Sequence, residues 1–296
     1  MAWRGVHITS AARLSLADGQ IVVVRDDGEV RLPIEDVAWM VIDTPRATLS
    51  TSLISACMDA GVVVVTTDRT HTPNGLILPF HRHHRQAEVA ALQAAMSLPL
   101  KKRLWQSIVV AKIANQAMVL DICGRDPSAV RAMGRLVGSG DPNNVEARAA
   151  RAYWSGLFSK FVREKPGDRR NALLNYGYAI VRSAVARGIV AAGLLPAFGL
   201  NHASITNAFN LADDLVEPFR PFVDKLVWHL TDEGRVVDGE TTVEERRSLT
   251  SVLVEETSFG GETMTLLVAS ERVAESVVRA IEANSPPLLT LPHMAA

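Results

Sequence analysis

Glu146 is the first residue whose surroundings suggest chemistry. It lies in "GSGDPNNVEARAARAYWSGL", which we expect to form a helix with Asp141 as N-cap and Pro142 at its first position. Helical spacing places Glu146 in an apolar stripe with Tyr153 and Leu157, opposite a polar face. A carboxylate in such a stripe must be paired, protonated or bound to a metal ion, because an isolated buried charge is costly. The simpler alternative is a salt bridge near the helix N-terminus, where negative charge is favoured.

A second acidic cluster lies in "NAFNLADDLVEPFRPFVDKL". Four polar residues share one face of the helix expected here: Asn210, Asp213, Asp214 and Glu217. Like charges this close repel one another, so a bound cation or cationic neighbours would stabilise them. Pro218 removes a backbone donor and disfavours helical geometry at Glu217, so we expect a kink that aims the Glu217 carboxylate. The alternative is a solvated acidic face.

His202 follows "FGLN" at an expected turn between two helices. A lone histidine is more often a structural group than a ligand, but neutral imidazole is a common metal ligand, and loops between rigid helices often hold sites. Two carboxylates and one imidazole would suit Mg²⁺ or Mn²⁺. Glu146, His202 and Glu217 span 72 positions, so only the fold can bring them together.

Three segments are locally basic: "HRHHRQ" (81–86), "KKR" (101–103) and "KFVREKPGDRR" (160–170). Each could be an ordinary solvated face, and the formal net charge of −1 gives no overall attraction for nucleic acid. A local patch matters more than the sum, so three such segments favour a surface that contacts phosphates. The candidate DNA-contacting residues are Arg82, Arg85, Lys160, Arg163, Arg169 and Arg170.

The elements that must position these residues fall into two parts. Residues 7–80 read mainly as strands, with Asp-Gly turns typical of hairpins and one helix in "LSTSLISACMDAG", for which Gly61 is a plausible C-cap. Strand character stops near 81–90, and the pattern is helical from there to about 284. We therefore predict an α+β protein: a small β-rich domain over 1–85, followed by a larger all-α domain over 86–296.

Composition favours a soluble protein of the reducing cytoplasm. A hydrophobic fraction of 48% is ample for a core, and Cys57 and Cys123 have no metal or disulfide spacing, so we expect both to be buried. The apolar stretch "LLNYGYAIVRSAVARGIVAAGLL" contains Asn175, Arg182 and Arg187, which predicts a core helix and no membrane span. No Walker, GxSxG, Rossmann or zinc CxxC motif supports another chemistry.

The chain resembles the CRISPR-associated integrase/endonuclease family of spacer acquisition, in the form that accompanies single-protein effectors (type II). The residues that carry the resemblance are "MAWRGVHITSAARLSL", "GLILPFHRHHRQ", "NNVEARAARAYW", "NALLNYGYAIVRSAVARGIVAAGLLPAFGLNH" and "FNLADDLVEPFRPFVD". It implies an N-terminal β domain that dimerises and a helical catalytic domain. It also implies that four integrase subunits assemble around two subunits of a small ferredoxin-like CRISPR partner.

By resemblance, the metal and catalytic residues are Glu146 in "NVEA", His202 in "GLNH" and Glu217 in "LVEPFRP". Asp214 is expected to assist without a direct metal bond, and the weaker supporting candidates are Asn175, Tyr153 and Tyr178. The cofactor would be Mg²⁺ or Mn²⁺, with no nucleotide required.

The implied reaction is transesterification on double-stranded DNA: the 3′-hydroxyl of a captured fragment attacks a phosphodiester at the edge of a CRISPR repeat. Two alternatives stay open at this point. One is a metal-dependent nuclease of branched or repair DNA, which would use the same residues. The other is a catalytically silent DNA-binding scaffold, for which the presence of all three proposed ligands is an argument against.

Overall fold

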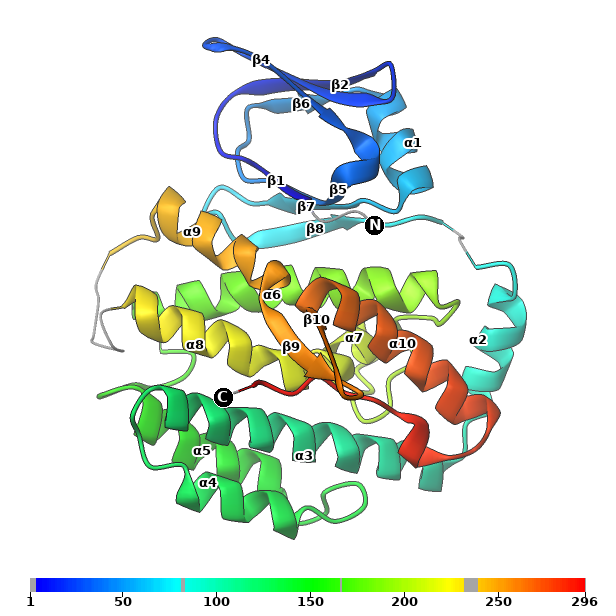
Figure 1. Cartoon of the computed structure of the whole chain (residues 1–296), viewed down its shortest axis with the longest axis vertical. Coiled ribbons are helices and arrows are strands. Elements are labelled where there is room, and N and C mark those ends of the chain that lie inside the picture. Colours follow the sequence, from blue (N-terminus) through cyan, green and yellow to red (C-terminus); the bar gives the residue numbers. More distant parts are fainter. Residues whose placement is uncertain (1–3, 81–82, 166, 232–238, 296) are drawn as a thin grey trace. The chain divides into compact units, whose positions relative to one another are not determined.

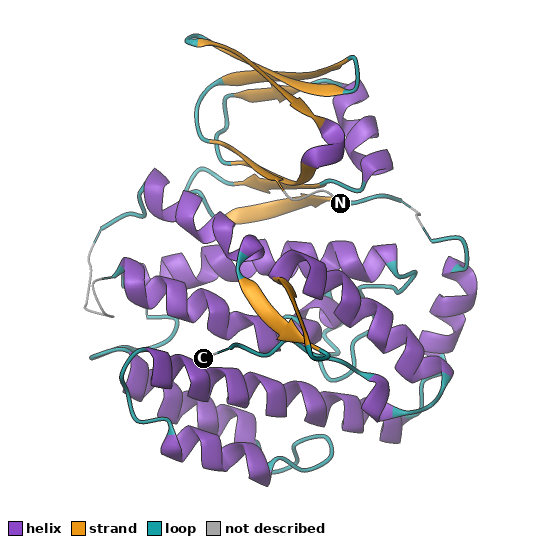
Figure 2. Ribbon diagram, viewed as in Figure 1, coloured by secondary structure: helices purple, strands orange, loops and turns teal. Residues whose placement is uncertain are grey.

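The computed structural model describes residues 4–80, 83–165, 167–231 and 239–295 (Figure 1). Two compact units divide the chain, Met1–His81 and Arg82–Ala296. Figure 2 shows that strands dominate the first unit and helices the second. The α+β class predicted from the sequence is confirmed.

The first unit contains two four-stranded sheets. One has the order β1-β5-β7-β8, in which the first three strands are parallel and the last is antiparallel. The other has the order β4-β3-β2-β6. The strands are β1 (Arg4–Ile8), β2 (Ala12–Ala17), β3 (Gln20–Arg25), β4 (Gly28–Pro33), β5 (Val37–Ile42), β6 (Ala47–Leu49), β7 (Val63–Thr67) and β8 (Pro73–Ile77).

Turn and cap residues place these elements where the sequence predicts them. Asp18 and Gly19 join β2 to β3 with φ of 50° and 70°, as a tight hairpin turn requires. Helix α1 (Thr51–Ala60) begins at the Ser50 cap and ends at Gly61, whose φ is 72°. Cys57 on α1 packs in the core of this unit and is free, as predicted.

The second unit is mainly helical. Its helices are α2 (Gln86–Ala94), α3 (Leu98–Ile122), α4 (Ser128–Met133), α5 (Val145–Leu157), α6 (Arg169–Ala191), α7 (Asn210–Leu215), α8 (Arg220–Leu230), α9 (Val243–Thr250) and α10 (Leu266–Glu282). Short 3₁₀ turns are η1 (Ile34–Asp36) in the first unit and η2 (Gly134–Leu136), η3 (Glu217–Phe219), η4 (Ser251–Val254) and η5 (Pro286–Leu288) in the second.

Helix α6 is the core helix that the apolar stretch predicts. Most of its length is buried, and it packs against α10, α9 and α8. Gly177 and Gly188 allow this packing, because a Cβ on Gly188 would lie 2.6 Å from the Ser270 carbonyl oxygen on α10. In the part of the chain that is described, no helix is both long and apolar enough to cross a bilayer.

Three features bear on the sequence predictions for this unit. The helix expected over 207–226 is interrupted at the predicted place, since α7 ends at Leu215, η3 carries Glu217 and Pro218, and α8 follows. A two-stranded hairpin, β9 (Glu256–Phe259) and β10 (Glu262–Thr265), was not predicted. Cys123 at the end of α3 is buried and free, as expected.

Candidate active site

Glu146 and Glu217 meet at a third residue, Lys112. Glu146 is carried by α5, Glu217 by η3 and Lys112 by the middle of α3. The Lys112 ammonium lies 2.6 Å from Oε1 of Glu146 and also forms an ion pair with Oε2 of Glu217. The three side chains expose 10% (Lys112), 25% (Glu146) and 6% (Glu217) of their surface. Two carboxylates that are far apart in the sequence therefore converge on one positive charge.

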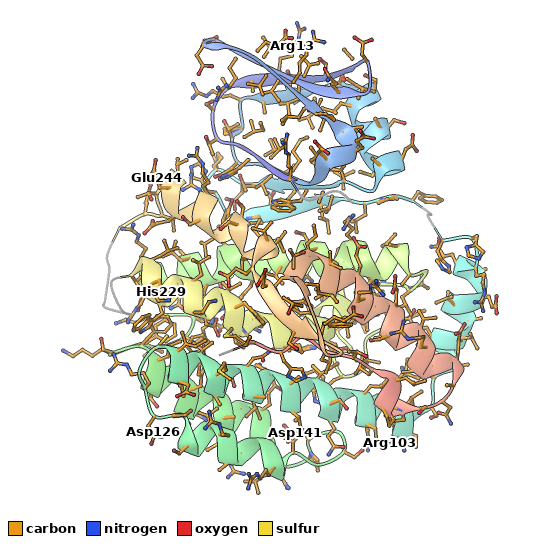
Figure 3. All side chains as sticks on the ribbon, in the orientation of Figure 1. Arg13, Arg103, Asp126, Asp141, His229 and Glu244 are labelled. Atoms are coloured by element: carbon orange, nitrogen blue, oxygen red, sulfur yellow. The ribbon has the colours of Figure 1, made fainter. Side chains whose placement is uncertain are left out.

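Asp141 fixes the start of the helix that carries Glu146. Its carboxylate accepts hydrogen bonds from the backbone N–H groups of Val145 and Glu146, both at 2.9 Å. The helix begins at Val145, with Asn144 at the cap position in the left-handed region, so the predicted start at Pro142 is wrong by three residues. Asp141 still caps the helix, from farther upstream. Figure 3 labels Asp141 among the side chains of the second unit. Glu146 consequently lies beside the buried stripe, at the mouth of the site.

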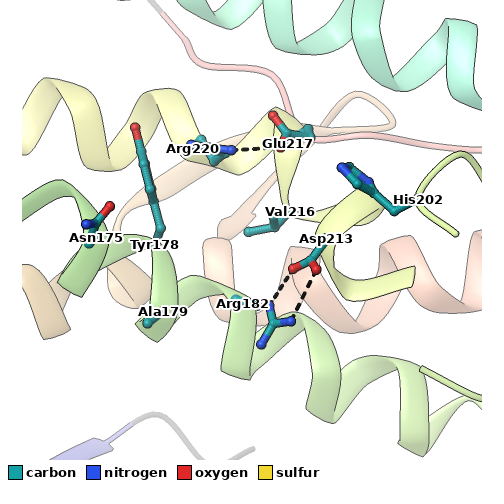
Figure 4. Close-up of a pocket in the computed structure, with 9 residues that line it drawn as sticks. All are labelled: Asn175, Tyr178, Ala179, Arg182, His202, Asp213, Val216, Glu217 and Arg220. Atoms are coloured by element: carbon teal, nitrogen blue, oxygen red, sulfur yellow. Dashed lines mark hydrogen bonds and ion pairs between the residues drawn. The ribbon is translucent and has the colours of Figure 1, made fainter. Parts of the chain in front are cut away.

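The kink after α7 presents Glu217. Pro218 has no N–H, and its carbonyl oxygen accepts a hydrogen bond from Asn115 Nδ2 at 2.7 Å. The other carboxylate oxygen of Glu217, Oε1, accepts from Arg220 Nη1 at 2.8 Å (Figure 4). Burial alone would raise the pKa of Glu217, but Lys112 and Arg220 outweigh it and lower the pKa to about 2. Glu217 is therefore ionised at neutral pH.

Asp214 organises the loop that carries His202. Its carboxylate is fully buried and accepts from the backbone N–H groups of Leu200 (2.5 Å), Asn201 (3.1 Å) and His202 (3.0 Å). It also pairs with Nδ1 of the His202 ring at 2.8 Å, and this contact raises the pKa of the imidazole. When Nδ1 donates to Asp214, Nε2 of the neutral ring is left as the acceptor.

Gly199 is required by this loop. A Cβ at this position would lie 2.2 Å from the His202 carbonyl oxygen and 2.8 Å from Oδ2 of Asp214. Any side chain there would displace the segment that Asp214 holds.

A pocket of about 310 Å³ opens beside Glu217 and His202 (Figure 4). Arg182 pairs with Asp213, which also lines the pocket, at 2.5 Å. Two guanidinium groups and two potential metal ligands thus face one space, which suits a phosphate-bearing substrate. Its lining residues are Asn175, Tyr178, Ala179, Arg182, His202, Asp213, Val216, Glu217 and Arg220.

The donor chemistry fits a hard divalent cation. Glu146 and Glu217 already hold one positive charge between them, and carboxylates with an imidazole suit Mg²⁺ or Mn²⁺. Within the described residues, no three His, Cys, Asp or Glu side chains stand close enough together to bind a metal as arranged. Lys112 is positioned where it separates the two glutamates. Glu146, His202 and Glu217 would be the residues to hold the ion; His202 and Glu217 line the pocket, and Glu146 joins Glu217 through Lys112.

Comparison with known proteins decides the family. The sequence profile of the family described as "CRISPR associated protein Cas1" matches residues 6–257. The CRISPR-associated endonuclease Cas1 of Neisseria meningitidis serogroup C is 37% identical over 296 residues, which cover 99% of this chain and 97% of the relative. The chain belongs to the Cas1 family.

Solved structures show that this chain has the fold seen in Cas1 proteins and in a casposase. A casposase bound to its integration product superposes with a TM-score of 0.77 at 17% identity, covering 96% of this chain and 92% of that one. A chain of a Cas6-RT-Cas1–Cas2 complex gives a TM-score of 0.73 at 18% identity and covers 97% of this chain, but this chain covers only 36% of that larger protein. Family membership confirms the predicted enzyme class, a CRISPR-associated endonuclease/integrase of spacer acquisition.

The supporting residues expected from the sequence fall into two groups. Asn175 and Tyr178 line the pocket, whereas Tyr153 is fully buried on α5 and lies outside it. Tyr153 and Tyr178 both donate to the buried carboxylate of Asp224 on α8, Tyr153 at 2.9 Å. Burial raises the pKa of Asp224 to about 6. This cluster joins α5, α6 and α8 and so braces the helix that carries Glu146.

Sequence reasoning missed Lys112, Asn115 and Arg220. The first two lie one turn apart on α3, in an apolar stretch, "VVAKIANQAM", where a lysine and an asparagine interrupt the buried face. Buried lysine is rare unless it is paired, so the lysine in this apolar stretch could have indicated a buried carboxylate partner. Arg220 follows Glu217 at i+3 and could have been proposed as its partner.

The candidate DNA-contacting residues are placed differently from one another. Arg170 is fully buried, with its guanidinium held by Asp168 and by the Ser159 carbonyl at 2.8 Å, so the prediction that it contacts DNA is wrong. Arg163 is half-buried and donates to Asn171 and Asn175. Arg169 is half-buried and pairs with Glu245. Lys160 and Arg85 are exposed, and Arg82 lies outside the described residues.

Proposed function

We propose that this Cas1 protein integrates captured DNA fragments into a CRISPR array by metal-dependent transesterification, with Glu146, His202 and Glu217 as the metal-binding and catalytic residues. The observation that carries the proposal is that Glu146 and Glu217 converge on one positive charge, the Lys112 ammonium. His202 borders the same pocket as Glu217. A scaffold that only bound DNA would not need a buried and a half-buried carboxylate held around the Lys112 ammonium.

In the proposed reaction, the oxygen of a fragment's 3′-hydroxyl forms a new bond to phosphorus at the repeat edge. The bond from phosphorus to the 3′-oxygen of the repeat strand breaks, and the proton lost by the attacking hydroxyl is balanced by one gained at the leaving oxygen. One phosphodiester replaces another, so no nucleotide is consumed. Bound Mg²⁺ or Mn²⁺ would supply Lewis-acid stabilisation of the phosphoryl and leaving oxygens.

The residues of the chain supply position and charge for this step. Asp214 orients the His202 ring through Nδ1, which would leave Nε2 available to bind the metal ion or to accept the reacting proton. Arg220 and Arg182 line the pocket and would attract a DNA phosphate. Arg220 also lies 4.2 Å from the centroid of the Tyr178 ring, which restricts its orientation.

The assembly that we propose has four subunits of this chain and two of a small ferredoxin-like CRISPR partner, acting on double-stranded DNA in the cytoplasm. The unit Met1–His81 would form the homodimer contact. Support comes from the solved neighbour that is a Cas1–Cas2 complex. The type II form is supported by the identity of 37% to the Neisseria relative over almost the whole chain.

The experiment is a comparison of substrates with the wild-type protein. Purified protein, the small partner and Mn²⁺ or Mg²⁺ would be mixed with a short duplex bearing free 3′-hydroxyls and a repeat-bearing supercoiled plasmid, and in parallel with branched DNA. We expect duplex joined to the plasmid at the repeat edge. Cleavage of branched DNA without any joining would favour the nuclease of repair DNA, and inertness on both substrates would favour the silent scaffold.

A further inference from the structure

Lys112 is a charged residue that the proposed reaction does not use. It is buried on the inward face of α3, among Ile108, Val109 and Ala111, all of which are 3% exposed or less. Lysine is almost never buried in such surroundings unless it is paired. Its ammonium group contacts one oxygen of Glu146 and one of Glu217, which come from separate elements.

The charges around Lys112 balance before any metal is added. Glu146 and Glu217 contribute two negative charges, and Lys112 and Arg220 contribute two positive ones. A divalent cation between the glutamates would add two positive charges, of which the buried Asp214 carboxylate beside His202 offsets one, so an excess of one positive charge would remain. Like charges a few ångströms apart repel strongly inside a protein, so one of the resident cations must withdraw.

Lys112 is the one that can withdraw. Arg220 contacts the opposite oxygen of Glu217 and stacks on the Tyr178 ring, so it lies beside the space between the glutamates rather than in it. Lysine has a flexible four-carbon stem and makes point-charge contacts, whereas arginine is held by its planar fork. Asn115, one turn further along α3, holds the Pro218 carbonyl at 2.7 Å and would keep the kink in place when the ammonium leaves.

Building on the proposed function, we propose that Lys112 is an internal counter-ion of the metal site. Its ammonium joins Glu146 and Glu217 while the divalent cation is absent and leaves the space between them when the cation binds. Lys112 is thus a positioning residue that sets the metal affinity. It holds the Glu146 and Glu217 carboxylates close together, and it weakens metal binding because its ammonium competes with the ion for them.

The test measures Mn²⁺ binding without DNA or turnover. Free Mn²⁺ would be followed by electron paramagnetic resonance during titration of metal-free wild type, Lys112→Met and Lys112→Gln. We expect both variants to bind Mn²⁺ at least about tenfold more tightly than wild type, because the competing charge is gone. Metal-free Lys112→Met should have a lower Tm than wild type, and saturating Mn²⁺ should raise its Tm by more. Should Lys112→Met fail to fold, Lys112→Gln carries the same expectation, since its amide can still donate to a carboxylate.

Two further variants separate the possible failures. Lys225→Met removes a lysine that pairs with Glu255 at 2.7 Å outside the pocket, and it should leave the Mn²⁺ affinity unchanged. Glu217→Gln should lose binding. If wild type binds and Glu217→Gln does not, but the Lys112 variants bind no more tightly than wild type, the counter-ion proposal is overturned and the proposed function stands. If no variant, wild type included, shows saturable binding, the metal site itself is refuted, and the proposed function fails with it.

Discussion

Asp214→Asn tests whether one buried carboxylate holds the His202 loop. Oδ2 of Asp214 accepts from two backbone N–H groups, and Oδ1 accepts from the N–H and the ring of His202. An asparagine can keep the Oδ1 contacts, but its NH₂ group then faces the Leu200 and Asn201 donors. Two hydrogen bonds to a charged acceptor are lost, each worth about 1.5–3 kcal/mol. After partial relaxation of the loop, we expect a loss of about 3 kcal/mol in the free energy of unfolding.

The assay is urea unfolding followed by circular dichroism, with Asp213→Asn as the matched control. Asp213 is the neighbouring residue, but its pairing with Arg182 is partly exposed, with side-chain exposures of 27% and 34%. Because the Arg182 pair is bidentate and Asp213 also accepts from Asn207 Nδ2, the control should lose about 1 kcal/mol, clearly less than Asp214→Asn. If the two variants are equally destabilised, the role assigned to Asp214 is refuted.

Three further outcomes follow from the packing around the site. Gly199→Ala should fold with a lowered Tm and lose strand transfer, because its Cβ would meet the His202 carbonyl oxygen, whereas unchanged transfer would show that the loop adapts. The pKa of Asp224 is raised from 3.8 to about 6, so the folded state binds the extra proton between these values, and stability falls as the pH rises through that window. Between pH 4 and pH 7, the free energy of unfolding of wild type, measured with urea, should fall by up to about 3 kcal/mol more than that of Asp224→Asn. If the free energies of unfolding of the two proteins change with pH in parallel, this prediction is contradicted. Arg170→Met should cost about 3–5 kcal/mol, since it leaves Asp168 unpaired, and should not alter the salt dependence of DNA binding.

Local sequence signals predicted the elements well wherever a residue acts on its own backbone. Asp18-Gly19 marks a hairpin and Gly61 a helix end, and Pro218 marks the break that presents Glu217. Each effect depends on allowed φ angles or on a missing N–H, so it can be read without knowledge of tertiary contacts. The unpredicted hairpin β9–β10 is short and completed by a bridge from Ser258 to His293, a contact that no local pattern reveals.

The partners of the charged residues could not be predicted in this way. Lys112 lies 34 positions from Glu146 and 105 from Glu217, so their convergence depends on how α3 packs on α5 and η3. Arg170 was assigned to a basic surface because charged residues are usually exposed, yet it is fully buried against its own neighbours Asp168 and Ser159. Composition gives the sign of a segment's charge, whereas the fold decides which of its charges reach solvent.

The central claim is that Glu146, His202 and Glu217 together form the metal site of a DNA-joining enzyme. Strand transfer by Glu217→Gln, with DNA binding measured on the same samples, tests it most directly. Glu255→Gln is the matched control, because Glu255 also pairs with a lysine but lies outside the pocket. We expect joined product from wild type and Glu255→Gln, none from Glu217→Gln, and DNA affinity retained by all three. Equal joining by Glu217→Gln and wild type would contradict it.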